Sequence, residues 1–148
     1  VQQTPPITGN LRITSSRDLP DSAADQLPTS TSLGVRCLDP ALVRVQDWSD
    51  GSDFATGIAR LRRALFSEFD KLIHEAAVDL AQRYLHYGFG AEAIELLSLN
   101  ADLAQDHPAL IDIANVMEFG TAAAGTYLPR FLDCDTDVAM WAILAARD

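Results

Sequence analysis

The chain has 148 residues, of which 48% are hydrophobic, a size that suits one domain with a tail or a piece of a larger protein. Its formal net charge of −10 at pH 7 would repel nucleic acid and anionic membrane surfaces, so we expect neither as a partner. The sequence contains no run of about 20 apolar residues and therefore predicts no membrane insertion.

The first 34 residues differ in composition from the rest and predict an extended arm or linker. They contain four prolines and much Ser, Thr, Gln and Asp, and only residues 11–14 alternate like a short strand. So few large apolar side chains cannot easily offset the entropy lost on ordering. An alternative is that residues 1–34 donate a strand or peptide to a neighbouring domain.

Residues 35–48 carry two conflicting signals at the start of a domain that we place at 35–148. Asp39 followed by Pro40 is typical of a helix N-cap with proline in the first turn. Val43 and Val45 alternate around Arg44, as in a strand. We expect a short helix that anchors Trp48 in the core, followed by a polar turn over 49–52.

A helical period of apolar side chains begins after this turn. Asp53 or Ser52 is the expected cap of the first helix, and we expect an interruption near 67–70. Asp70 would then cap a second helix over 71–87. The periodic apolar residues are Phe54, Ile58, Leu61, Leu65, Phe69 and Leu72.

The rest of the chain predicts further helices and no sheet. Gly88 and Gly90 allow a tight turn before a helix over 91–99, and we expect a connector over 100–106. Pro108 opens a helix that ends near 119–120, and a single turn is expected near 129–132. Residues 135–137 would cap a last helix. The predicted fold class is all-α.

The stretch 77–97 resembles a tetratricopeptide repeat, a helix–turn–helix unit of about 34 residues. A second copy, 33 residues further on, matches only in its first helix, and Ala77 stands where the family prefers tryptophan. The resemblance implies antiparallel helix hairpins stacked as a short superhelix. The matching residues are Leu80, Ala81 and Tyr84, then Gly88, then Ala93 and Leu97.

What the resemblance implies about function is the binding of a peptide or another protein in a concave groove, without catalysis. The candidate partner-binding residues on the first helix are Asp79, Gln82, Arg83 and His86. The alternative is that these four residues are simply a solvated face. The competing function is a helical accessory domain or subunit of a bacterial enzyme, whose catalytic residues lie elsewhere or include Cys134 near a helix start.

Two further surface features could contact a partner. Arg60, Arg62 and Arg63 form the only basic cluster in the chain, although ion pairing with neighbouring acids also explains them. Four aromatic residues, if exposed together, would mark a docking surface. They are Phe89, Phe119, Tyr127 and Phe131.

Cys37 and Cys134 are the only cysteines and lie 97 positions apart. They could form a bridge in an exported protein or be two buried thiols in a cytosolic one. We expect buried thiols, because a free cysteine behaves as a small hydrophobe, but export stays open. The chain begins at Val1 and stops just after an apolar segment, so we expect part of a longer protein.

The histidines do not predict a metal site. His74 and His86 would lie about 18 Å apart along a continuous helix, too far to share one ion. The sequence also lacks a phosphate-binding loop and a dinucleotide-binding glycine pattern. We therefore predict no metal and no cofactor.

Overall fold

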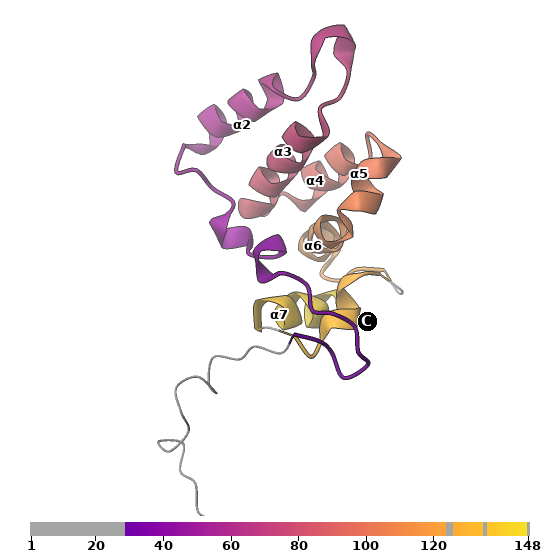
Figure 1. Ribbon diagram of the computed structural model, residues 1–148. Helices are drawn as coiled ribbons and strands as arrows, with labels where there is room; N and C mark the ends of the chain where they lie inside the picture. The colour runs from indigo at the N-terminus through magenta and orange to yellow at the C-terminus, as the bar shows by residue number, and fades with distance from the viewer. Residues whose placement is uncertain (1–28, 124–125, 135, 148) are drawn as a thin grey trace, which may run out of the picture.

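The computed structural model describes residues 29–123, 126–134 and 136–147, and this part of the chain is all-α, as predicted (Figure 1). Four short 3₁₀ segments and two isolated β-bridges accompany its helices, and it holds no β-strand. Most of the predicted arm, including residues 11–14, lies outside the described residues. The helices are α2 (Phe54–Arg63), α3 (His74–His86), α4 (Gly90–Leu97), α5 (Ala101–Asp106), α6 (Pro108–Phe119) and α7 (Thr136–Ala145).

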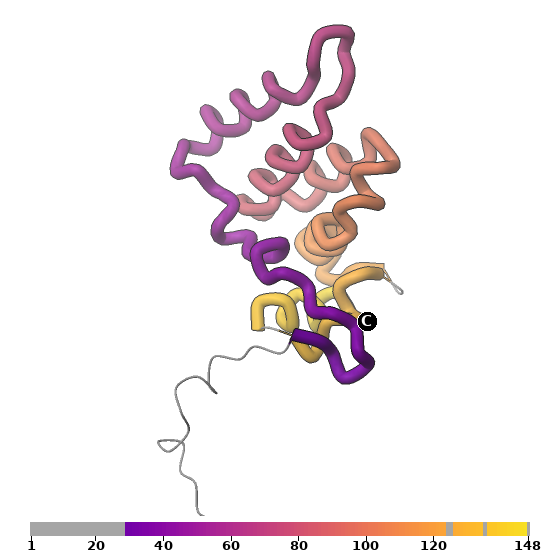
Figure 2. Tube along the Cα trace, viewed as in Figure 1, coloured from indigo at the N-terminus to yellow at the C-terminus, as the bar shows by residue number. Residues whose placement is uncertain are grey.

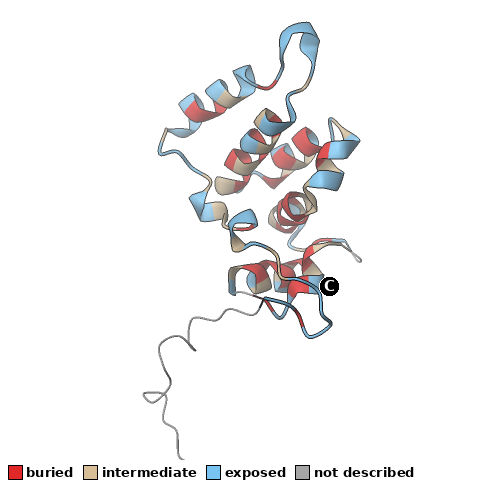
Figure 3. Ribbon diagram, viewed as in Figure 1, coloured by how far each residue is buried: buried red, intermediate tan, exposed pale blue. Residues whose placement is uncertain are grey.

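Helices α3, α4 and α6 pack against one another and form the centre of the core (Figures 1 and 2). Helix α2 packs on α3, whereas α7 packs on α6 and on the 3₁₀ segment Leu128–Phe131. Buried residues concentrate where these helices face each other (Figure 3). Within the described residues, no helix combines the length and the apolar character needed to cross a membrane.

Helices α3 and α4 pack on each other, and the small residues on them are buried. Ala77, Ala81 and Ala93 are fully buried, and so is Leu97. Gly88 adopts a positive φ of 82° between the two helices, a conformation that glycine adopts without strain. The chain can therefore reverse direction within three residues and bring both apolar faces together.

Gly90 marks a second close approach, between the start of α4 and α6. A Cβ atom built at this position would lie 2.6 Å from the carbonyl oxygen of Ala114 and 3.0 Å from the backbone nitrogen of Glu118. Both atoms belong to the backbone of α6, so they cannot move aside as a flexible side chain can. The packing of α4 on α6 requires glycine here.

The segment between α2 and α3 differs from the prediction. Asp53 caps α2, accepting a hydrogen bond from the Thr56 N–H at 3.0 Å, but α3 begins only at His74. Residues 64–73 form a loop closed by an antiparallel bridge between Phe66 and Leu72. The helix predicted over 71–87 is present as α3, but the prediction that Asp70 caps it is wrong, because Ile73 occupies the cap position and Asp70 has a positive φ angle of 55°. Phe69 is 97% exposed in this loop instead of facing the core.

Two other segments depart from the predicted elements. The expected connector over 100–106 contains α5, whose first turn is capped by the Asn100 side chain accepting from the Asp102 N–H at 2.8 Å. Residues 35–48 form two 3₁₀ segments, Pro40–Leu42 and Val45–Asp47, instead of one helix. The helix over 108–119 and the turn near 128–131 are confirmed, whereas α4 ends at Leu97 and the expected cap Asp135 lies outside the described residues.

Asp112 connects α6 to the turn before α7. Its side chain is buried and accepts a hydrogen bond from the Leu128 N–H at 2.7 Å. Burial raises the pKa of this carboxyl group, because the charged form is poorly solvated there. The hydrogen bond positions the 3₁₀ segment Leu128–Phe131, on which α7 packs.

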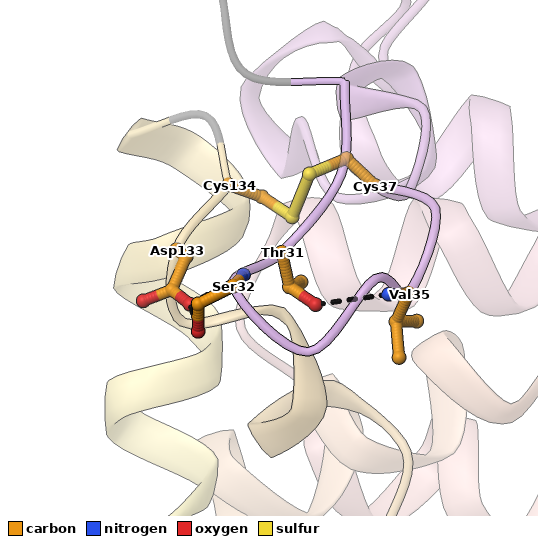
Figure 4. The surroundings of a disulfide bond; sticks show 6 residues. All are labelled: Thr31, Ser32, Val35, Cys37, Asp133 and Cys134. Carbon is orange, nitrogen blue, oxygen red and sulfur yellow. Dashed lines mark hydrogen bonds between the residues drawn. A yellow bond between two sulfur atoms is a disulfide. The ribbon is translucent and has the colours of Figure 1, made fainter.

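Cys37 and Cys134 form a disulfide, so the expectation of two free thiols is wrong (Figure 4). The bond ties the segment before the first 3₁₀ turn to the segment that precedes α7. Beside it, the backbone N–H of Ser32 donates to Asp133 at 3.1 Å and its hydroxyl donates at 2.6 Å. These bonds lower the pKa of Asp133, and they hold the N-terminal segment next to the disulfide.

We predict that replacing both Cys37 and Cys134 by serine lowers the free energy of unfolding by about 2–5 kcal/mol, because the bond closes a long loop and restricts the unfolded chain. Urea denaturation of the oxidised protein and of the double variant measures the difference. Adding a reductant should bring the wild type to the stability of the variant. Two titratable thiols in the native, unreduced protein would contradict the assignment.

We predict that Gly90→Ala destabilises the protein by about 1–3 kcal/mol through overpacking of α4 on α6. Alanine favours a helix over glycine by about 1 kcal/mol, so at an uncrowded site the same substitution would stabilise the protein. Thermal and urea unfolding show whether the variant is less or more stable than the wild type. A variant as stable as the wild type, or more stable, would show that the two backbones do not meet at Gly90.

Candidate functional site

The structure places the four predicted partner-binding residues on α3 but in different surroundings. Asp79 is exposed and Gln82 is half-buried, while Arg83 is only 7% exposed. His86 is half-buried, and its Nδ1 lies 2.9 Å from the Val45 carbonyl oxygen, which accepts a hydrogen bond from the ring. Arg83 and His86 therefore make hydrogen bonds within the protein itself.

Arg83 fastens the 48–52 segment to α3. Its Nε donates to the Trp48 carbonyl at 3.2 Å, and its Nη1 donates to Asp50 at 3.0 Å and to the Ser52 hydroxyl at 3.2 Å. Hydrogen bonds from Ser52, Arg60 and Arg83 lower the pKa of Asp50 and keep it ionised. A Cβ atom on Gly57 would lie 2.7 Å from Arg83 Nη1, so glycine makes room for this network.

Asp79 and Gln82 line hollows on the same side of α3. One hollow, of about 280 Å³, lies over the Arg83 network and is lined by Asp79, Gln82 and Arg83. Asp79 also borders a second hollow with His74 and His107. Three of the four predicted residues therefore share one hollow, and His86 does not line it.

A larger hollow lies elsewhere, between α2, the 64–73 loop, α3 and α4, with a volume of about 410 Å³. We call it the α2–α4 groove. None of the four predicted residues lines it. Its lining residues are Arg62, Leu65, Phe66, Leu80, Tyr84, Glu92, Glu95, Leu96 and Leu99.

The groove has an apolar floor and an apolar rim. Its floor consists of side chains that are almost completely buried, and two of them, Leu80 and Tyr84, lie one turn apart on α3. On the rim, Phe66 is 49% exposed and Leu99 is 58% exposed. The remaining floor residues are Leu65 and Leu96.

Opposite charges occupy the two walls of the groove. On α2, Arg62 donates to the Tyr84 hydroxyl through Nε at 2.9 Å and through Nη2 at 2.6 Å, and its guanidinium carbon lies 5.8 Å from the centre of the tyrosine ring. On α4, Glu92 and Glu95 are exposed and lie on the same helix face because they are three residues apart. The groove can therefore hold apolar side chains and distinguish the charges beside them.

The aromatic residues proposed as a docking surface do not gather in one place. Phe131 is 3% exposed and packs against Tyr127, with ring centres 5.0 Å apart, so its predicted exposure is wrong. Phe89 instead packs with Phe54, whose ring also contacts Tyr87 at 5.0 Å. This second aromatic group lies at the turn between α3 and α4.

The candidate chemical groups named from the sequence do not assemble into a reactive centre in the described part. The sulfur of Cys134 is bonded to Cys37, so it carries no thiol. Among these residues, no three His, Cys, Asp or Glu side chains are placed to hold a metal ion. The α2–α4 groove is suited to binding.

We predict that Asp50→Asn makes the unfolding free energy less sensitive to acid. The pKa of Asp50 is lowered on folding, so its contribution is present above the ordinary value of 3.8 and is lost as the pH falls further. Urea unfolding across acidic and neutral pH tests this difference. Asp102→Asn, which removes an exposed carboxylate outside the network, is the control and should keep the wild-type pH dependence.

Comparison of the chain with protein-family models, with curated protein sequences and with solved structures finds no match. A function is therefore proposed below from the arrangement of the residues in the structure.

Proposed function

We propose that this chain is a tetratricopeptide-like protein-interaction module that binds a segment of another protein in the α2–α4 groove and has no catalytic activity of its own. The observation that carries the proposal is the pair of half-exposed apolar side chains, Phe66 and Leu99, on the rim of an apolar floor. Single exposed apolar residues are common on protein surfaces. Two of them around one hollow form a patch that a partner can cover.

The energy for binding would come from removing this patch from water. Burial of apolar surface contributes roughly 25 cal/mol per Å². A partner side chain that enters the hollow would contact Leu80 and Leu96 while covering Phe66 and Leu99. Tyr84, held by Arg62, offers a rigid aromatic surface at the same place, the type of residue that often dominates binding energy.

The 64–73 loop supports the same interpretation. It projects beyond the helices (Figure 1), and its residue Phe69 is almost completely exposed. Phe69 and Asp70 both have left-handed backbone conformations, which cost about 1 kcal/mol or more for each non-glycine residue. Strain of this kind is often retained at binding sites. We infer that the loop is a second contact surface beside the groove.

The proposed site differs from the four residues named from the sequence. Arg83 and His86 are engaged by the 45–52 segment, and Asp79 and Gln82 line other hollows. The competing accessory-domain hypothesis named Cys134, whose sulfur is held in the disulfide. We therefore propose Phe66 and Leu99 as the principal contact residues.

We predict that the double substitution F66S/L99S weakens peptide binding by about tenfold or more, because it removes the apolar rim. The probes are peptides selected from a random displayed library against the full, oxidised chain, and fluorescence anisotropy measures their affinities. The control F119S/I143S removes one aromatic and one aliphatic residue that are also exposed but lie outside the groove. Selected peptides that bind all three proteins equally would refute the proposed site.

A further inference from the structure

We infer that the α2–α4 groove selects a partner segment in which lysine or arginine residues accompany large apolar side chains, with the cations facing α4. This inference rests on the proposed function and specifies the chemistry of its ligand. Three features of the groove carry it: the carboxylates on α4, the arrangement of Arg62, and the apolar surface between these two walls.

The α4 wall presents two carboxylates that form no ion pair with the described residues. The ion pairs in the described residues join Arg44 to Asp137 and both Arg60 and Arg83 to Asp50, so neither Glu92 nor Glu95 takes part. Both glutamates are exposed and line the groove. A bound segment could therefore pair two cations with them along one helix face.

Among the described residues that line the groove, the one cationic side chain lies on the opposite wall. Arg62 directs two N–H groups at the Tyr84 hydroxyl, and its guanidinium group lies near the tyrosine ring. This arrangement places the positive charge on α2 and the negative charges on α4. A segment with acidic residues facing α4 would meet like charges, which disfavour binding.

The apolar surface between the walls favours lysine or arginine over a small inorganic cation. These side chains have long aliphatic stems that pack on apolar surface while the charged end stays in water. Leu96 and Leu99 lie one to seven residues from the two glutamates on and just after α4. The net charge of −10 would also attract a basic segment at long range.

The test uses three fluorescein-labelled peptides of about a dozen residues, with identical Leu and Phe positions and with Lys, Gln or Glu between them. Fluorescence anisotropy gives their affinities for the full, oxidised chain. We expect the Lys peptide to bind most tightly and the Glu peptide least tightly. E92Q/E95Q should weaken the Lys peptide by about three- to tenfold, the size expected for two exposed ion pairs, and leave the Gln peptide unchanged.

The control E75Q/E118Q removes the same amount of charge from exposed positions that line neither the groove nor the 64–73 loop, and it should leave the Lys peptide unaffected. Equal weakening by both double variants would overturn the inference, because net charge alone would then explain binding. Equal affinities of the Lys and Gln peptides, with both weakened by F66S/L99S, would overturn the inference and leave the proposed function standing. Lys-peptide binding that F66S/L99S does not change would overturn both.

Discussion

The close approach of α3, α4 and α6 is the constraint on which the rest of the structure depends. Ala81 and Ala93 are fully buried between α3 and α4, and Gly90 brings the start of α4 against the backbone of α6. Larger side chains at these positions would push the helices apart. Because α4 packs on α3 and α6 in this orientation, Glu92 and Glu95 face outward beside the groove. Leu80 and Tyr84 on α3 form the floor of the groove.

The elements that the sequence predicts well are those whose signals are local. Pro108 and Gly120 bound α6, and the small residues of 77–97 identify the face where α3 meets α4. The interruption near 67–70 was predicted, but the length of the 64–73 loop was not, because the apolar period continues through Phe69 and Leu72 after the helix has ended. An antiparallel β-bridge between Phe66 and Leu72 closes the loop, and the helical spacing of the apolar residues does not reveal this pairing. The disulfide could not be chosen from two cysteines 97 positions apart, since only the tertiary fold brings them together.

The candidate site was harder to predict than the helices, because three separate segments build it. The sequence does show Glu92 and Glu95 one helical turn apart, with Leu96 and Leu99 next to them, but nothing local reveals that Phe66 comes to the same place. Arg83 illustrates the converse error. Its position suggested a solvated helix face, yet the 48–52 segment folds over α3 and buries it. Polar residues on a helix therefore cannot be assigned to a surface until the covering segments are known.

The wall formed by α2 is held by few buried residues, which are Gly57 and Ile58 within the helix. Helix α2 packs mainly on α3, and its described polar contacts include the pairing of Arg60 with Asp50 and the hydrogen bonds from Arg62 to Tyr84. Segments held by exposed polar contacts open at lower free energy than segments held by a core. The α4 wall, in contrast, is fixed by Gly90 and by fully buried alanines. A partner would therefore dock on a rigid acidic wall, and the groove would adjust its width through α2 and the adjoining loop that carries Phe69.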